Sequence, residues 1–439
     1  MAITFYAFWN GAEVADLFHA VVGITGSGDY VMLLKCAALL GFLMAVAFCA
    51  VRYRGQDIII WCAGFVLLTF TLYIPTTTVV VHDVRARTDQ AVENVPLGLG
   101  WPAGVLSHIS YWLTRQFETA FNDPDTTHFS EFGMALPQRT ITALLAAGPV
   151  TSQGQESLSR FIEHCVVPEV LSSAVRRHEI LTSTNLWKTV SGTGWVNPAR
   201  HVLIDETMMR CPDAAGAIEQ YLNSEEIPRM SAILAGKLEL PENALQNGML
   251  ARVVPGAEEI MLGVSQSLTD TLKHTVMISS LPQAMSSFSA AQRSPMNVAI
   301  AISRSQGNLS SEINYRTIGL MAQDALPKLR NQLEFIVLAV FPLVIILVIA
   351  AGQGGVPILK AYFTLLISLS LWAPITAAMN YLTIHVDANP MNRLVAEYGG
   401  MTLQAVDLIR EAGASSQAMA SMLLWVVPLF AYAIAKGSD

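Results

Sequence analysis

The segment VMLLKCAALLGFLMAVAFCAV, residues 31–51, decides the fold, because Lys35 is its one charged side chain. An α-helix needs about 20 apolar residues to cross a hydrocarbon core roughly 30 Å thick. Four more apolar runs of this kind occur along the chain, at residues 58–81, 333–351, 358–382 and 418–435. The sequence therefore predicts an all-α polytopic membrane protein with five transmembrane helices.

The composition favours a membrane protein over a soluble enzyme. Of the 439 residues, 52% are hydrophobic and 14% are charged, whereas about a quarter of the residues in soluble domains are charged. The 26 Lys and Arg residues are outnumbered by 34 Asp and Glu residues, so the net charge is −8. The chain therefore has no excess of positive charge to neutralise phosphates, which argues against nucleic-acid binding by the bulk of the chain.

The predicted spans divide the chain into parts of very unequal length. In order, these are an N-terminal arm (1–30), the first two spans (31–81), a long connector (82–332), two more spans (333–382), a loop (383–417) and the fifth span with a short tail (418–439). The connector has about 250 residues, which is long enough to be a domain of its own.

Basic residues near the span ends predict the orientation, because cytoplasmic loops carry an excess of Lys and Arg. Residues 1–30 contain neither, whereas Arg52 and Arg54 follow the first span and Lys436 follows the fifth. The N-terminus and the connector are therefore expected outside, and the C-terminus inside. Four basic residues that flank the connector argue against this orientation: Arg85, Arg87, Lys328 and Arg330.

Two cysteines, Cys165 and Cys211, lie outside the predicted spans, and both fall in the connector. The other three, Cys36, Cys49 and Cys62, lie within spans, where a thiol behaves as a small apolar group. If the connector faces an oxidising compartment, Cys165 and Cys211 should form a disulfide. The alternative is a pair of unbonded, buried thiols.

The apolar residues of the connector recur at helical spacing. Helices are predicted over residues 101–121, around 158–165 and over 255–280. The first has an apolar stripe formed by Val105, Ile109, Trp112, Leu113 and Phe117. Glycines and β-branched residues between 187 and 205 fit a short hairpin. The connector is expected to be a mainly helical domain.

The interiors of the predicted spans contain almost no ionisable side chains, although a pump or transporter usually needs them there. Asn380, the one amide deep in the fourth span, is interpreted as a helix-packing residue, with solute binding as the alternative. The first span has small residues at four-residue intervals, Ala37, Gly41 and Ala45, which let another helix approach closely. That helix belongs either to the same chain or to another protomer.

The N-terminal arm is rich in aromatic residues, including Phe5, Tyr6, Phe8 and Trp9. Amphipathic aromatic side chains settle at the membrane interface. We interpret these four residues as interfacial anchors of a helix that lies on the outer membrane surface. The alternative is a helix packed on the connector domain.

No motif for catalysis, cofactor binding or metal binding is recognisable. The sequence has no GxxxxGK[ST] loop, and its GSG and GTG segments lack the spacing of a dinucleotide site. His178 and Glu179 begin a string similar to HExxH, but residue 182 is threonine, so the second zinc ligand is missing. We therefore expect no catalytic residues, no cofactor and no metal, and a protein that is not an enzyme.

Four segments resemble the N-terminal domain of the TraG family: FYAFWNGAEV (5–14), PTTTVVVHD (75–83), NVPLGLG (94–100) and LWAPITAAMNYL (371–382). TraG proteins are mating-pair stabilisation proteins of F-type conjugative type IV secretion systems. The resemblance covers nearly the whole chain, through scattered segments and overall layout. Because the chain ends three residues after Lys436, it is expected to be the N-terminal portion of a longer protein.

The resemblance implies a bacterial inner-membrane component that supports pilus assembly and mating-pair stabilisation, with its N-terminus and large loop in the periplasm. By analogy with the polytopic channel subunit of simpler secretion systems, the protomers would form a homo-oligomeric ring of about five at the pilus base. The implied partners are pilin, other secretion subunits and membrane lipid. Single-stranded DNA would meet the protein only in a central lumen, which the connector's 19 basic and 24 acidic residues do not favour.

Two other functional classes stay open. A secondary transporter would bind a solute between its spans. A membrane receptor would bind a ligand in its periplasmic domain and would need a signalling module after the fifth span.

Overall fold

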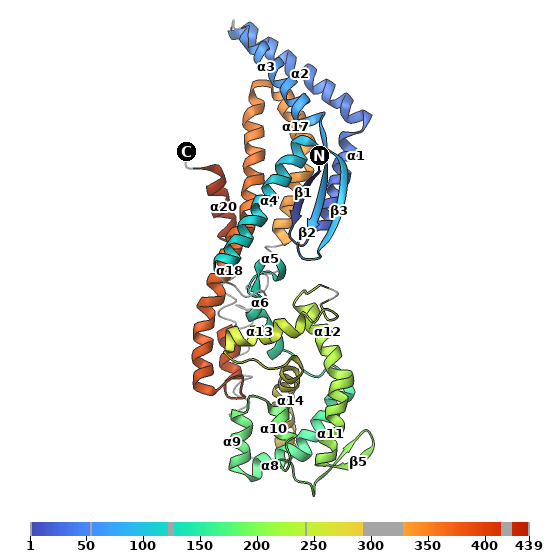
Figure 1. The fold of residues 1–439 in the computed structure, drawn as a ribbon, viewed down its shortest axis with the longest axis vertical. Coiled ribbons are helices and arrows are strands. Elements are labelled where there is room, and N and C mark those ends of the chain that lie inside the picture. The colour runs from blue at the N-terminus through green and yellow to red at the C-terminus, as the bar shows by residue number, and fades with distance from the viewer. Residues whose placement is uncertain are drawn as a thin grey trace.

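The computed structural model describes residues 2–52, 55–121, 127–241, 244–292, 328–413 and 424–437. The molecule is elongated, with long apolar helices at one end and a helical domain at the other (Figure 1). The prediction of a mainly helical chain is confirmed, but the chain is not all-α, because it also contains two small sheets.

The larger sheet has three strands in the order β1 (Ala2–Ala7), β2 (Thr76–Asp83) and β3 (Thr88–Pro96). β1 runs parallel to β2, and β3 returns antiparallel to it. Alternate residues of β2 are buried, as in a strand that has one covered face. The second predicted span is therefore wrong beyond residue 75. Its helical part consists of α3 (Gln56–Leu68) and η1 (Thr69–Tyr73), and the following threonines and valines join the sheet.

Two helices pack on this sheet: α1 (Gly11–Thr25) and α4 (Leu97–Ala120). The N-terminal arm thus forms the strand β1 and then the helix α1, which packs on β2 and β3. This arrangement is closer to the alternative, a packed helix, than to a helix on the membrane surface. Phe5 and Phe8 are buried, and the ring of Phe5 packs edge-on against Phe18 of α1. The interpretation of these two residues as interfacial anchors is wrong, because the protein core covers them.

Two helices are long and apolar enough to cross a membrane, Gly28–Val51 in α2 (Gly28–Arg52) and α18 (Gly355–Tyr398). A third candidate is the bent pair Lys328–Ala339 and α17 (Phe341–Ala351), which meet at 46°. Ile58–Tyr73 and α20 (Val427–Lys436) are shorter apolar helices. The described residues thus provide two to three candidate spans where the sequence predicted five. Residues 418–423 of the fifth predicted span lie outside the described residues.

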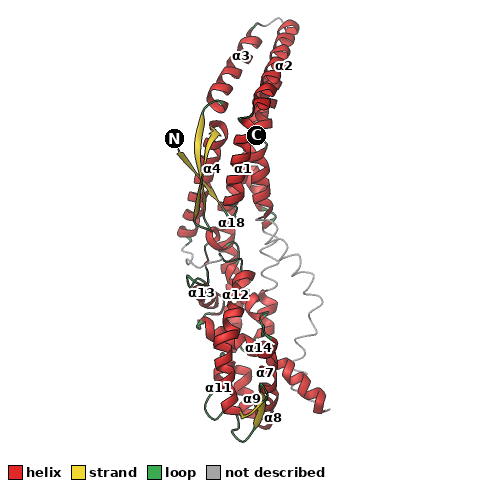
Figure 2. Cartoon of the chain, turned by 90° about the vertical axis from the view of Figure 1, so that its right-hand side faces the viewer, coloured by secondary structure: helices red, strands yellow, loops and turns green. Residues whose placement is uncertain are grey.

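α18 has 44 residues, which corresponds to a length of about 66 Å. It packs on α17 near its start, on α4 and α20 further along, and on α13 of the helical domain. The predicted loop 383–417 is therefore wrong in its first part, where the helix continues as far as Tyr398. This single helix connects the apolar end of the molecule to the helical domain (Figure 2).

The helical domain contains mainly short helices around one large core. Its elements are α5 (Phe129–Phe132), α6 (Leu136–Leu145), α7 (Ser152–Phe161), η3 (Ile162–Val166), α8 (Val167–Ser172), α9 (Ala174–Thr182), α10 (Leu186–Val190), β4 (His201–Ile204), β5 (Thr207–Arg210), α11 (Cys211–Tyr221), η4 (Leu222–Glu226), α12 (Ile227–Lys237), α13 (Leu250–Leu262) and α14 (Leu268–Gln292). Only β4 lies in the range 187–205 that was predicted to form a hairpin; it pairs with β5, which follows that range, and the start of the range belongs to α10. The helix predicted over 255–280 is divided at Gly263, which adopts a left-handed conformation with φ +61°.

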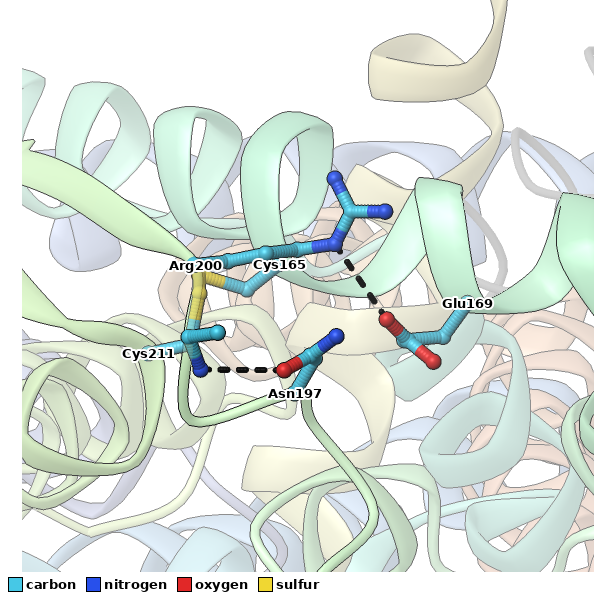
Figure 3. Close-up of a disulfide and its surroundings, with 6 residues drawn as sticks. Cys165, Glu169, Asn197, Arg200 and Cys211 are labelled. Atoms are coloured by element: carbon cyan, nitrogen blue, oxygen red, sulfur yellow. Dashed lines mark hydrogen bonds and ion pairs between the residues drawn. A yellow bond between two sulfur atoms is a disulfide. The ribbon is translucent and has the colours of Figure 1, made fainter.

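A disulfide joins Cys165 of η3 to Cys211, the first residue of α11, as the sequence predicted. The two Cα atoms are 5.7 Å apart, and both residues are buried. Beside it, Nε of Arg200 lies 3.3 Å from a carboxylate oxygen of Glu169, which joins the hairpin to α8 (Figure 3). The bridge therefore fixes the start of α11, which directly follows the hairpin, to η3.

His274 connects three segments of the domain from a fully buried position on α14. The backbone N–H of Leu186 donates to its Nδ1 at 3.0 Å, so Nε2 bears the proton and donates to the carbonyl oxygen of Met401 at 2.6 Å. Burial lowers the pKa of His274 from 6.5 to about 4, and the hydrogen bond to Met401 opposes that shift. The imidazole is therefore neutral in the folded protein at neutral pH.

Acidification is expected to destabilise the helical domain through His274. Because its pKa is lower in the folded state, its contribution is fully present above pH 6.5 and is lost as the pH falls toward 4. At pH values below 4, the lost contribution of His274 to the unfolding free energy amounts to about 3 kcal/mol. Urea unfolding at several pH values should show this loss, and His274→Gln should reduce the pH dependence. An equal change in His201→Gln, which alters an exposed histidine, would contradict the assignment.

Candidate functional site

The segments PTTTVVVHD and FYAFWNGAEV meet at the carboxylate of Asp83, at the end of β2. One oxygen accepts the backbone N–H of Gly11 at 2.8 Å, and the other accepts those of Arg85 and Ala86 at 2.9 and 2.8 Å. A Cβ on Gly11 would lie 2.7 Å from Cβ of Asp83, so only glycine fits there. Asp83 thus caps the start of α1 and holds the turn between β2 and β3.

The segment NVPLGLG begins α4 and lets this helix approach the sheet closely. Cβ atoms added at Gly98, Gly100 and Gly104 would each lie 2.7 to 2.8 Å from side chains of η1, β2 and β1. Further along α4, Ser107 Oγ accepts the backbone N–H of Tyr6 at 3.1 Å. Tyr6 is in β1, which is an edge strand of the sheet. α4 therefore covers the free edge of β1, on the side away from β2.

The segment LWAPITAAMNYL in α18 contributes Asn380, which is fully buried. Its Oδ1 accepts the backbone N–H of Ala135 at 2.8 Å, and its Nδ2 donates to the carbonyl oxygen of Thr127 at 3.1 Å. Both polar atoms are therefore used on the backbone that leads into the helical domain. Asn380 is a packing residue, as interpreted, but its partner is a loop and not another helix.

Removal of the Asn380 amide is expected to weaken the connection between α18 and the helical domain. Asn380→Ala removes the hydrogen bonds to the buried N–H of Ala135 and to the carbonyl oxygen of Thr127, which should cost about 3 kcal/mol of unfolding free energy. Thermal unfolding of the purified protein measures this loss. The matched control is Asn223→Ala on η4, where the asparagine is exposed. Similar unfolding temperatures for the two variants would show that the Asn380 contacts do not stabilise the fold.

The outward face of α4 is apolar, which reverses the usual arrangement of a helix on a sheet. Its buried face contains glycine, serine and threonine, whereas Trp101 and Trp112 are 56% and 54% exposed and Ile109 is exposed between them. Exposed apolar patches of this kind mark membrane contacts or protein interfaces. We call Trp101, Ile109 and Trp112 the outer α4 face.

The small-residue ridge of α2 packs against α17 of the same chain. Ala37 and Ala45 are buried, and a Cβ on Gly41 would lie 2.3 Å from the carbonyl oxygen of Ile349. At one end of the contact between α2 and α17, the hydroxyl of Tyr30 donates to the carbonyl oxygen of Pro342 at 2.9 Å. The ridge therefore has an intramolecular partner, and the exposed apolar side chains of α2 and α3 point elsewhere.

Sequence reasoning missed the buried carboxylates that position these segments. Glu118 of α4 accepts both the backbone N–H and the hydroxyl of Ser130, at 2.8 and 3.0 Å. Glu226, also fully buried, accepts the hydroxyl of Thr151 at 2.6 Å at the start of α7. Their partners lie 12 and 75 residues away in the chain, so no local motif reveals them.

No group of three or more His, Cys, Asp or Glu side chains is placed to hold a metal ion within the described part of the chain. Cys165 and Cys211 are oxidised to a disulfide, which leaves no thiolate for a metal there.

Comparison with known proteins identifies the same family that the four segments resemble. The family described as TraG-like protein, N-terminal region, matches residues 4–439. Protein TraG of Escherichia coli (strain K12) is 21% identical in an alignment of 435 positions that covers 96% of this chain and 45% of that protein. The chain thus spans about half the length of this curated relative. No solved structure matches. The chain belongs to the TraG-like family and corresponds to its N-terminal region.

Proposed function

We propose that this chain is an inner-membrane platform component of a conjugative type IV secretion system, which supports pilus assembly and mating-pair stabilisation. The family match over residues 4–439 carries the proposal. Two to three candidate spans agree with a membrane location. The proposed role is structural and not enzymatic, and the platform would rely on separate proteins for energy.

The proposed platform is a ring of several copies at the pilus base. The outer α4 face and the exposed side chains of α2 and α3 support this proposal, because such surfaces require lipid or protein partners. The proposed partners are other copies of the chain, pilin, other secretion subunits and membrane lipid. Single-stranded DNA would be met only in a central lumen.

The proposed orientation places the N-terminus and the helical domain in the periplasm. The Cys165–Cys211 disulfide supports this location, because disulfides persist in oxidising compartments. α18 would then connect the membrane-spanning helices to the periplasmic domain, since it packs on α17 and on α13 of the helical domain.

Mating assays test this function directly. Donor cells that lack the gene should lose plasmid transfer and surface pili, and the wild-type gene should restore both. Trp112→Asp should reduce transfer at normal protein levels, because it places a charge on the outer α4 face. Met208→Asp is the matched control, since Met208 is also an exposed apolar residue but lies on β5 in the helical domain. Normal transfer and normal pili in the deletion strain would refute the proposal.

A further inference from the structure

A cleft separates the end of the large sheet from the loop that follows α12. Its volume is about 520 Å³. The sheet side contributes Trp9, Asp83, Arg85 and Ala86, and the other side contributes Glu239, Leu240 and Pro241. Clefts between structural units are common places for ligands.

The Arg85 guanidinium lies in this cleft without a hydrogen bond or ion pair to any described residue. It is half-buried, and its Cζ lies 6.0 Å from the centre of the Trp9 ring. Burial lowers the pKa of Arg85 from its ordinary value; the carboxylates of Glu239 and Asp83 oppose this shift, and Arg139 adds to it. A partly desolvated guanidinium has five N–H donors, which require acceptors.

The nearby carboxylates do not meet that requirement. Asp83 uses both oxygens on backbone N–H groups. Glu239 is held loosely, since its oxygens lie 3.9 Å from Nη2 of Arg139 and 4.0 Å from Nζ of Lys328. These distances exceed hydrogen-bond range. Arg85, Arg139 and Lys328 carry three positive charges near the two carboxylates of Asp83 and Glu239, which leaves one positive charge uncompensated.

We propose that this cleft binds a phosphate-bearing anion, with Arg85 as its main donor. A phosphate group offers several acceptor oxygens to the guanidinium, which donates to phosphate in a bidentate manner. One negative charge of a phosphate group would balance the excess of the three cations over Asp83 and Glu239. Trp9, Leu240 and Pro241 provide an apolar wall that suits the ester part of a lipid headgroup. Free phosphate and an anionic lipid headgroup share this chemistry.

The test uses the full chain in nanodiscs and separates the two sources. In phosphatidylcholine nanodiscs, inorganic phosphate is titrated by calorimetry. In nanodiscs that also contain phosphatidylglycerol, native mass spectrometry measures how much of that lipid stays bound. Binding in the first arm identifies free phosphate, and retention in the second alone identifies a headgroup. Arg85→Gln should weaken whichever binding is found by about tenfold, the amount expected for a hydrogen bond to a charged group.

The matched control is Arg87→Gln, on the same turn as Arg85. Arg87 is exposed and pairs with Glu131 at 3.4 Å, away from the cleft, so its variant should bind as the wild type does. Arg139→Gln provides a second variant from another element, and Glu239→Gln should strengthen binding because it removes the competing carboxylate. The proposal is overturned if neither anion binds, or if Arg85→Gln and Arg87→Gln weaken binding equally. Because it rests on the cleft alone, it stands whether or not the chain acts in conjugation.

Discussion

Gly41→Leu is expected to separate α2 from α17 and to unfold much of the apolar end of the protein. Any Cβ at this position would lie 2.3 Å from the carbonyl oxygen of Ile349 and 2.8 Å from Nε1 of Trp61. The first atom is backbone and cannot move without its helix. Overpacking of a well-packed site costs about 1–3 kcal/mol, and a leucine side chain requires more displacement than one methyl group. Thermal unfolding in detergent and the yield of folded protein measure the effect.

Gly64→Leu is the matched control for this prediction. Gly64 lies on the neighbouring helix α3, and nothing lies within 4 Å of an added Cβ. Its variant should keep the wild-type unfolding temperature. If Gly41→Leu were as stable as Gly64→Leu, the packing of α2 on α17 would have to differ from the one described.

Replacement of both Cys165 and Cys211 by serine is expected to destabilise the helical domain by about 4 kcal/mol. The bridge closes a loop with a sequence separation of 46 residues, and its loss restores the freedom of that loop in the unfolded chain. Each serine also buries a hydroxyl in a core of apolar residues. Urea unfolding of the oxidised protein, followed through the helical signal, measures the change in midpoint.

Cys62→Ser should leave the midpoint unchanged, because Cys62 is a free, exposed cysteine on α3. Reduction of the wild type should reproduce the behaviour of the double variant. Equal midpoints for the oxidised wild type and the double variant would mean that the bridge does not stabilise the domain.

The sequence predicted those features that depend on local pattern. The apolar run at 31–51 became α2, its small residues became a packing ridge, and the buried residues around 158–165 became the helix that holds the disulfide. In each case one face or one run of residues determines the structure. Spacing alone is sufficient for such predictions.

The pairing of β1 with β2 was missed because these two strands are far apart in the sequence and meet only in the folded chain. The β2–β3 hairpin is local, but its first strand was predicted as the end of a span. Residues 76–81 continue an apolar run, and such a run fits a helix or a strand equally well until a partner is known. Here the partner is β1, 76 residues earlier in the chain. The contact between Gly11 and Asp83 spans 72 residues. Without an observed contact, the sequence gives no sign that these segments meet.

The prediction for α4 shows a second limit of periodicity. Its apolar stripe was correctly placed on a helix, and within that stripe Ile109 and Trp112 face outward. Periodicity locates the apolar face of a helix without showing what covers it. The glycines of the opposite face decided the packing, because they allow the backbone to approach the sheet.

Cryo-electron microscopy of the full chain in detergent tests the platform proposal most directly. We predict rings of several copies around an axial lumen, with the helical domains forming a crown on one side of the membrane belt and the outer α4 face covered by lipid or by a neighbouring copy. Single copies with a closed cavity between their apolar helices would contradict the platform and would favour a transporter.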